Sequence, residues 1–181
     1  MFTMGHDAEV FARNKQGVLV PAIGLVGGTK EAPDPCKHGA LQEDNVMAEL
    51  NIEPALDAAH FISNTKSVMS ELKHRLGKYK LEVYISPHAE FTAQDLDTPE
   101  AHTSGCDPDY DAWEMCENTP IPLEQTLSRY AGGHIHYGLD FRDSPAEVTR
   151  FIKNLDCTIG VGMLVMFGIS ERNKTYGRFG A

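Results

Sequence analysis

The chain has 181 residues, of which 41% are hydrophobic and 23% are charged, and its 16 basic against 26 acidic residues give a formal charge of −10. This length and composition are typical of a single globular domain with a packed core, spanning residues 1–181. The acidic balance argues against a nucleic-acid-binding protein, because such proteins normally present a basic surface to phosphates. An excess of carboxylates is compatible with divalent-cation binding as well as with plain solubility.

The cysteines, the N-terminus and the apolar segments together indicate where the protein is located. None of the four cysteines belongs to a Cys-x-x-Cys pair, so neither a zinc knuckle nor a thioredoxin-like motif is predicted. The N-terminal stretch is too polar for a secretory signal, and no apolar run approaches the roughly 20 residues that span a bilayer. We therefore expect free thiols, a cytoplasmic location and no membrane partner.

Short strands are predicted in the first half of the chain. Residues 7–12, a turn at 14–17 and residues 18–22 together predict a β-hairpin. Residues 24–35 are rich in glycine and proline and are predicted to form a loop, whereas residues 46–52 alternate and predict another strand.

Two helices follow. Residues 57–76 repeat apolar side chains at helical spacing, and Gly77 stands where a C-cap is expected. A strand is predicted over residues 81–85, and prolines break the segment 86–122. Ser144-Pro145-Ala146-Glu147 combines an N-cap serine, a proline at N1 and a capping-box glutamate, so it predicts the start of the second helix. These elements together predict an α+β fold with a largely antiparallel sheet.

The most informative segment runs from Arg129 to Gly138 and contains Gly-Gly-His-Ile-His. Residues two apart in a strand share a face, so His134 and His136 are predicted to lie side by side while Ile135 faces a core. Glycines allow a ligand to approach the backbone closely, which suits a metal or a phosphate. A strand with two hydrogen-bonded histidines is the alternative interpretation.

Acidic residues at the same spacing stand on other predicted strands. Asp7 and Glu9 share a face of the first strand, and Glu49, with Asp44 shortly before it, supplies carboxylates from another strand. Carboxylates gathered on one face repel each other unless a cation lies between them, and Mg²⁺ or Mn²⁺ prefers oxygen ligands. The hypothesis is a cation site of carboxylates and a histidine; a solvated strand face is the alternative.

Two basic features could bind phosphate. The segment Gly27-Gly28-Thr29-Lys30 is similar in composition to phosphate-cradling loops, because backbone N–H groups and an ammonium both attract anions. Arg172, Lys174 and Arg178 form a positive cluster that could clamp a nucleotide or a substrate carboxylate. The alternatives are a turn with a surface lysine and a basic tail without function. At Cys106, a proline turn is favoured over a catalytic thiol.

The motifs occur in the order Gly-x-Asp-x-Glu, Gly-Gly-Thr-Lys, Asp-Asn-x-x-x-Glu, Gly-Cys-Asp-Pro-Asp, Arg-x-x-Gly-Gly-His-Ile-His and Arg-x-x-x-Tyr-Gly-x-x-Gly-Ala. This order resembles the phage-type carboxylate–amine ligases (type 2 amidoligases) of the glutamine-synthetase superfamily, over residues 5–181. Gly-Gly-His-Ile-His is the most specific part of the resemblance. The resemblance implies a glutamine-synthetase-like partial barrel with two main helices packed on one face.

The resemblance also implies a function, an ATP- and Mg²⁺-dependent (or Mn²⁺-dependent) ligase. ATP would phosphorylate a substrate carboxylate, and an amine would displace the phosphate to form an amide. The implied partners are small-molecule or peptide acids and amines, with a homo-oligomer open, and the location is the host cytoplasm for a phage-encoded member. By this resemblance, metal binding falls to Asp7, Glu9, Glu49, His134 and, less directly, Asp44. Contact with ATP falls to His136 and Lys30, and stabilisation of phosphate charge to Arg129, Arg172 and Arg178.

One departure from the family concerns the end of the chain. Members usually continue past Tyr-Gly-x-x-Gly-Ala into strands that carry an arginine and a late glutamate, whereas this chain stops at Ala181. We therefore expect a fragment or a C-terminally shortened member, with oligomerisation as one way to supply missing parts. Two other functions stay open: a metal-dependent hydrolase that acts without ATP, and a non-catalytic remnant that serves as a binding module.

Overall fold

The computed structural model describes residues 2–103, 110–119, 123–139 and 144–168. The chain divides into two compact units. The first comprises Met1–Gly105 and Leu123–Leu139, and the second comprises Cys106–Pro122 and Asp140–Ala181. The acid-bearing strands, residues 24–30 (the glycine loop) and the His-x-His motif all belong to the first unit.

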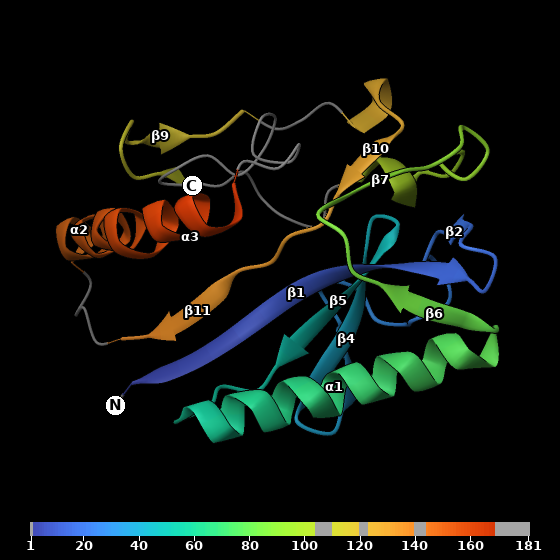
Figure 1. Ribbon diagram of the computed structural model, residues 1–181, viewed down its shortest axis with the longest axis horizontal. Helices are drawn as coiled ribbons and strands as arrows, with labels where there is room; N and C mark the ends of the chain where they lie inside the picture. Colours follow the sequence, from blue (N-terminus) through green and yellow to red (C-terminus); the bar gives the residue numbers. More distant parts are fainter. Residues whose placement is uncertain (1, 104–109, 120–122, 140–143, 169–181) are drawn as a thin grey trace. The chain divides into compact units, whose positions relative to one another are not determined.

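The first unit is built on an antiparallel sheet that curls into half of a barrel (Figure 1). Its strands are β1 (Thr3–Asn14), β2 (Leu19–Val20), β3 (Asp34–Cys36), β4 (Gly39–Asp44), β5 (Met47–Ile52), β6 (Leu81–Tyr84) and β11 (Ile135–Gly138). The main path runs β11-β1-β5-β4-β3, and β2 and β6 also pair with β1. Because β1 pairs with four strands, it joins parts of the chain that are far apart in sequence.

A smaller ladder and two short turns complete this unit. Strand β7 (His88–Glu90) pairs with β10 (Ser128–Tyr130), which places Arg129 opposite Ala89. The turns η1 (Glu100–His102) and η2 (Leu123–Gln125) are single 3₁₀ turns.

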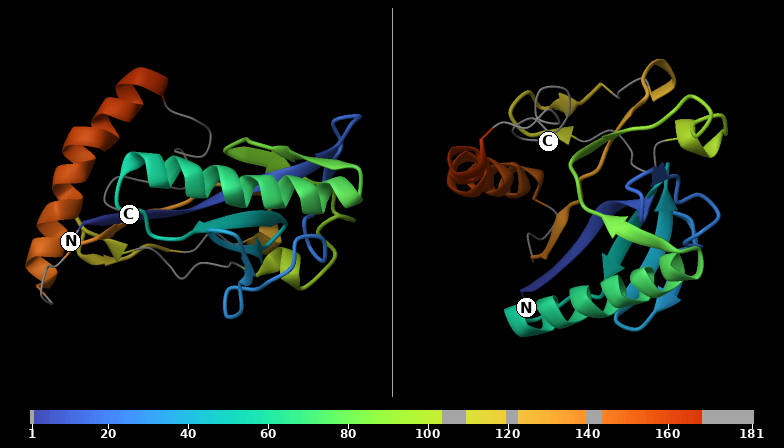
Figure 2. Two further views of the ribbon diagram at one scale, coloured as in Figure 1. Left: turned by 90° about the horizontal axis from the view of Figure 1, so that it is seen from below. Right: turned by 45° about the vertical axis from the view of Figure 1, so that its right-hand side comes forward.

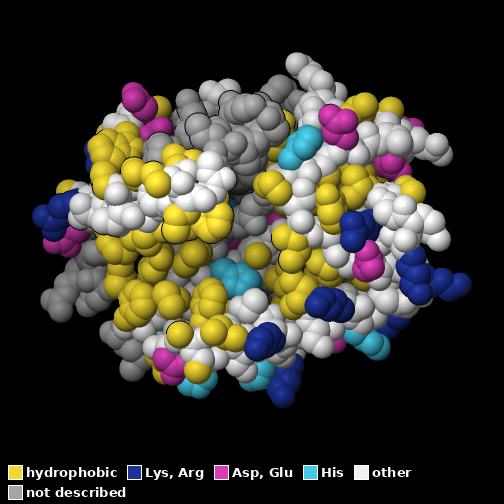
Figure 3. Space-filling view, viewed as in Figure 1, with side chains coloured by type: hydrophobic (Ala, Val, Ile, Leu, Met, Phe, Trp, Pro, Cys, Tyr) yellow, Lys and Arg dark blue, Asp and Glu magenta, His cyan; other side chains and the backbone are white. Residues whose placement is uncertain are grey.

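Helix α1 (Ala58–Lys78) packs against β4, β5 and β6 (Figure 2). Asp57 caps it by accepting a hydrogen bond from the backbone N–H of His60 at 2.8 Å. The predicted helix is confirmed, but the C-cap is Tyr79, and Gly77 lies inside the last turn. Basic and histidine side chains face solvent along α1 (Figure 3). Its buried positions, which recur at helical spacing, are Asn64, Val68, Leu72 and Leu76.

The two faces of the sheet bury different apolar clusters. Val10, Leu41 and Leu50 pack with the buried side of α1, whereas Phe11 and Met47 belong to a second cluster. Successive residues of a strand point to opposite faces. The odd-numbered acids of β1 and β5 therefore share the face of Phe11 and Met47, on the side away from α1.

The second unit is described by itself. Its strands β8 (Tyr110–Asp111) and β9 (Cys116–Glu117) form one ladder, and α2 (Pro145–Leu155) continues through a π-helical turn (Asp156–Gly160) into α3 (Val161–Phe167). The predicted N-cap is confirmed, because the Ser144 side chain accepts from the backbone N–H of Glu147. Trp113 Nε1 donates to Asp156 Oδ2 at 2.7 Å.

The α+β class, the antiparallel sheet and the two main helices are confirmed. Strands β3 and β4 were not among the predicted strands, and β4 is the one that matters for the site. None of the helices in the described ranges is long and apolar enough to cross a membrane.

Candidate functional site

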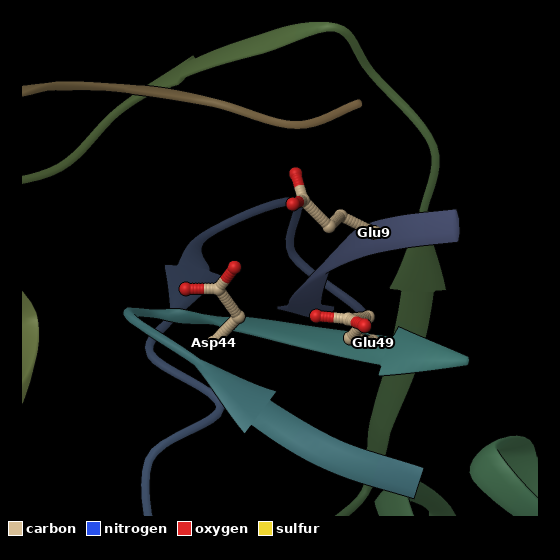
Figure 4. A group of neighbouring side chains, drawn as sticks. All are labelled: Glu9, Asp44 and Glu49. Atoms are coloured by element: carbon tan, nitrogen blue, oxygen red, sulfur yellow. The ribbon is translucent and has the colours of Figure 1, made fainter. Parts of the chain in front are cut away.

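Three carboxylates from three strands converge on the face of the sheet away from α1 (Figure 4). Glu9 on β1 lies directly opposite Glu49 on β5, and Asp44 ends β4. One carboxylate oxygen of each residue lies within 4.8 Å of those of the other two. Asp44 and Glu49 are only 5% and 6% exposed. We call Glu9, Asp44 and Glu49 the acidic cluster; its hard oxygen donors are the type that Mg²⁺ and Mn²⁺ prefer.

The protonation of Glu49 shows how unfavourable this crowding is. Burial, followed by the charges of Asp7 and Asp44, raises the pKa of Glu49 to about 7, while hydrogen bonds from Gln42 and Asn51 oppose the rise. A buried carboxylate next to others is costly to ionise without a compensating positive charge. A bound cation would supply that charge, so the donor set fits a divalent cation.

Two amide side chains support Glu49, and of these Gln42 was not predicted to lie at the site. Gln42 Nε2 donates to Glu49 Oε2 at 3.0 Å, and Asn51 Nδ2 donates to Gln42 Oε1 at 3.0 Å. Gln42 lies directly opposite Glu49 across β4 and β5. The signal was its spacing of two residues from Asp44, but that signal has meaning only once β4 is recognised as a strand.

Asp7 forms a second group beside the acidic cluster. Its Oδ2 lies 3.1 Å from His134 Nδ1 and 3.0 Å from His136 Nε2, and its Oδ1 accepts the backbone N–H of His134. Burial alone would raise the pKa of Asp7, but the hydrogen bonds from these two histidines hold that pKa well below its usual range. Both imidazoles therefore contact the same oxygen, Asp7 Oδ2, and lie on the same side of their segment, as alternation predicts.

The structure gathers part of the expected ligand set. Both oxygens of Asp7 contact His134 or His136. Asp44, with Glu9 and Glu49, forms the group whose oxygens lie within 4.8 Å of one another. The two groups are still neighbours, since Asp7 and Glu9 share a face of β1 and the charge of Asp7 acts on Glu49.

Gly132 and Gly133, which precede the two histidines, allow the backbone to lie close to β1. Gly132 donates its N–H to Glu9 Oε2 at 2.7 Å, and the Glu9 N–H donates to the Gly132 carbonyl at 3.0 Å. Gly133 has φ 141°, and a Cβ added there would lie 2.8 Å from Ala8 Cα. The expectation that Ile135 faces a core is wrong, because Ile135 is 58% exposed on β11, a strand at the end of the sheet path.

Arg129, which is predicted to stabilise phosphate charge, is buried and holds loop backbone in this structure. The side chain is 1% exposed. Its guanidinium donates to Asn45 Oδ1 and to the backbone carbonyls of Ala101, Thr126 and Ser128, at 2.8 to 3.3 Å. Four of its five N–H groups are thus used to hold loop backbone.

The glycine loop already holds an anion, and that anion belongs to the protein. The backbone N–H groups of Gly24, Val26 and Gly27 donate to the Glu43 carboxylate at 2.9, 3.2 and 2.9 Å. The Thr29 N–H donates to the Ala32 carbonyl, which closes a turn. The Glu43 carboxylate therefore uses the N–H group of Gly27, the first residue of the predicted phosphate-binding segment, and two N–H groups that precede that segment.

Lys30 is exposed on the glycine loop. Arg172, Lys174, Arg178 and Cys106 lie outside the described residues.

The site combines two groups of side chains. One is the acidic cluster, whose carboxylate oxygens are close enough to bind one cation. The other is a pair of partly exposed imidazoles, His134 and His136, both held by the Asp7 carboxylate. His134 and His136 keep 44% and 61% of their side-chain surface exposed, so each can meet a ligand while Asp7 orients it. Comparison with models of known protein families, with curated proteins and with solved structures finds no match to the chain.

Proposed function

We propose that the chain is an ATP-dependent carboxylate–amine ligase that forms an amide bond through an acyl phosphate. The observation that carries the proposal is the convergence of Glu9, Asp44 and Glu49 beside the group of Asp7 with two histidines. The order of the sequence motifs adds the ligase chemistry to this cation site. The antiparallel sheet is compatible with the fold that the resemblance implies.

In this proposal the acidic cluster holds Mg²⁺ or Mn²⁺. When bound, such a cation neutralises charge on the phosphates of ATP. His136, with its exposed ring, contacts a phosphate, and Asp7 keeps that ring and the ring of His134 in place. Lys30, Arg172 and Arg178 retain their predicted role of binding phosphate or carboxylate charge.

The reaction has two balanced steps. The γ-phosphoryl group of ATP passes to an oxygen of the substrate carboxylate, which leaves ADP and an acyl phosphate. An amine then attacks the acyl carbon, and inorganic phosphate leaves. The acids and amines are small molecules or peptides.

The first test is nucleotide binding. Calorimetry with ATP and Mg²⁺ is expected to show binding by the unchanged protein and a loss of at least tenfold, by order of magnitude, in Glu9→Gln and His134→Ala. Glu53→Gln is the matched control, since it removes one negative charge from a side chain that is 62% exposed. Equal binding by all four proteins would reject the site.

The second test separates the three candidate functions. Amino acids and short peptides are offered as acids, ATP as phosphoryl donor, and hydroxylamine as a small amine that converts acyl phosphates into coloured hydroxamates. A ligase forms hydroxamate in step with ADP. Hydrolysis of an ester or amide bond that depends on Mn²⁺ but not on ATP would indicate a metal-dependent hydrolase, and the absence of both activities together with no metal-dependent nucleotide binding would indicate a non-catalytic module.

A further inference from the structure

We infer that Gln42 is a positioning residue that fixes the Glu49 carboxylate for a cation in the acidic cluster. The inference rests on the cation site of the proposed function and not on its ligase chemistry. It concerns a side chain that touches neither nucleotide nor substrate in the proposal.

The geometry places Gln42 directly behind one ligand. Gln42 is 6% exposed and lies opposite Glu49 in the β4–β5 register. Its Nε2 donates to Glu49 Oε2 at 3.0 Å, while its Oε1 accepts from Asn51 Nδ2 at 3.0 Å. The two bonds run in one direction, from Asn51 through Gln42 to Glu49.

The choice of an amide at this position has a physical reason. A buried polar side chain without partners destabilises a protein, so a glutamine is tolerated here because both ends of its amide are bonded. A carboxylate at position 42 would add a further negative charge opposite Glu49. An apolar side chain would remove the donor from Glu49 Oε2. Glutamine alone of these three gives Glu49 a neutral donor.

Fixed orientation matters more for a cation ligand than for a structural hydrogen bond. The carboxylates of the acidic cluster come from three different strands, so the side chains must be aimed at one point for their oxygens to converge. The hydrogen bond from Gln42 holds one oxygen of Glu49 and thereby sets the plane of the carboxylate. Outer partners of this kind commonly change metal affinity by about 10- to 100-fold when they are removed.

Titration with Mn²⁺, followed by the electron paramagnetic resonance of the free ion, tests this inference without any enzyme assay. Gln42→Met keeps the length of the side chain but removes both the donor and the acceptor. We expect it to bind Mn²⁺ about 10- to 100-fold more weakly while it stays folded. Gln94→Met, at an exposed position, is the matched control and should bind like the unchanged protein.

Two further variants separate positioning from packing and from charge. Asn51→Ser removes the outer bond of the relay and the contact of Asn51 with Glu49 but leaves the Gln42 donor in place, so it should lose less affinity than Gln42→Met, and it serves as the test if Gln42→Met does not fold. The double variant Gln42→Glu with Glu49→Gln keeps the net charge and a hydrogen-bonded pair but moves the carboxylate to β4. It should remain folded and bind Mn²⁺ as weakly as Glu49→Gln.

The outcomes are distinct. If the unchanged protein binds Mn²⁺ and both Gln42→Met and Asn51→Ser bind it equally well, the positioning role is overturned and the cation site stands. Full affinity in the double variant would show that net charge, not the placement of Glu49, holds the ion, and would overturn the inference as well. No Mn²⁺ binding by the unchanged protein would overturn the inference together with the proposed function.

Discussion

Glu9 and Glu49 face each other directly across β1 and β5, with Asp44 completing the group from the end of β4. Like charges at directly opposed positions of a sheet destabilise it. Here two of the three carboxylates are also buried. An arrangement that costs stability in the free protein is expected at a site that binds a positive ligand.

The stability of the protein should depend on Glu49 in a pH-dependent way. Glu49 has a folded-state pKa of about 7 against an ordinary value of 4.5. Between these values the unfolded chain has released a proton that the folded chain retains, so the contribution of Glu49 to stability falls as pH rises and levels off above about 7. In EDTA at pH 8, Glu49→Gln should raise the free energy of unfolding by about 1–3 kcal/mol, and at pH 4 it should have little effect. Urea unfolding at both pH values measures this. A difference that is the same at both would contradict the account.

The glycine loop should depend on its internal anion. Glu43→Ala leaves the N–H groups of Gly24, Val26 and Gly27 without their acceptor and should lower the free energy of unfolding by about 1–3 kcal/mol. Glu43→Gln should cost less, because its amide oxygen can still accept. Hydrogen exchange at the three amides, measured by NMR, should speed up in the alanine variant. Unchanged exchange would show that the carboxylate does not hold the loop.

Arg129 should be required for folding rather than for binding. Arg129→Met removes the donors to the carbonyls of Ala101, Thr126 and Ser128 and should cost about 2–4 kcal/mol in thermal or urea unfolding. Arg129→Lys should rescue little, because a single ammonium cannot reach acceptors spread around a planar guanidinium. ATP binding by whatever fraction stays folded should be unchanged. A stable Arg129→Met protein that fails to bind ATP would restore the catalytic role.

Two glycines should respond in opposite directions to the same substitution. Gly133→Ala forces a Cβ to 2.8 Å from Ala8 Cα at φ 141°, so it should cost more than about 1 kcal/mol and loosen the histidines from Asp7. Gly77→Ala lies inside α1 with open space around it and should stabilise the protein by about 0.5–1 kcal/mol. Unfolding experiments and imidazole NMR shifts check the pair. A harmless Gly133→Ala would contradict the close approach to β1.

Apolar periodicity revealed helix α1 almost to its ends, because its buried positions recur at helical spacing. Strand β5 was also predicted almost to its ends, although both of its faces are buried and only Asn51 is partly exposed. Strand β4 escaped prediction because its residues Gln42, Glu43 and Asp44 are polar and consecutive. Gln42 and Asp44 face the polar site and Glu43 binds the glycine loop, so no apolar alternation exists there.

The part of the site that follows from alternation within a single strand could be predicted. A period of two placed Asp7 beside Glu9 and His134 beside His136 without knowledge of the fold. Two further features decide which acids meet across strands: the register of the strands and the turn after Asp44, where Asn45 adopts φ 57°. The spacing of residues along the sequence specifies neither of them. The same limit explains Ile135: alternation gives its side of the strand, but not whether anything covers that side.

The central claim, that the acidic cluster holds a divalent cation, is tested most directly by crystals soaked in Mn²⁺ and measured at a wavelength where manganese scatters anomalously. We expect one anomalous peak within coordination distance of oxygens from Glu9, Asp44 and Glu49, and its loss in crystals of Glu49→Gln. An unchanged peak in Glu49→Gln, a peak bound only elsewhere, or no peak in fully soaked crystals would contradict the claim.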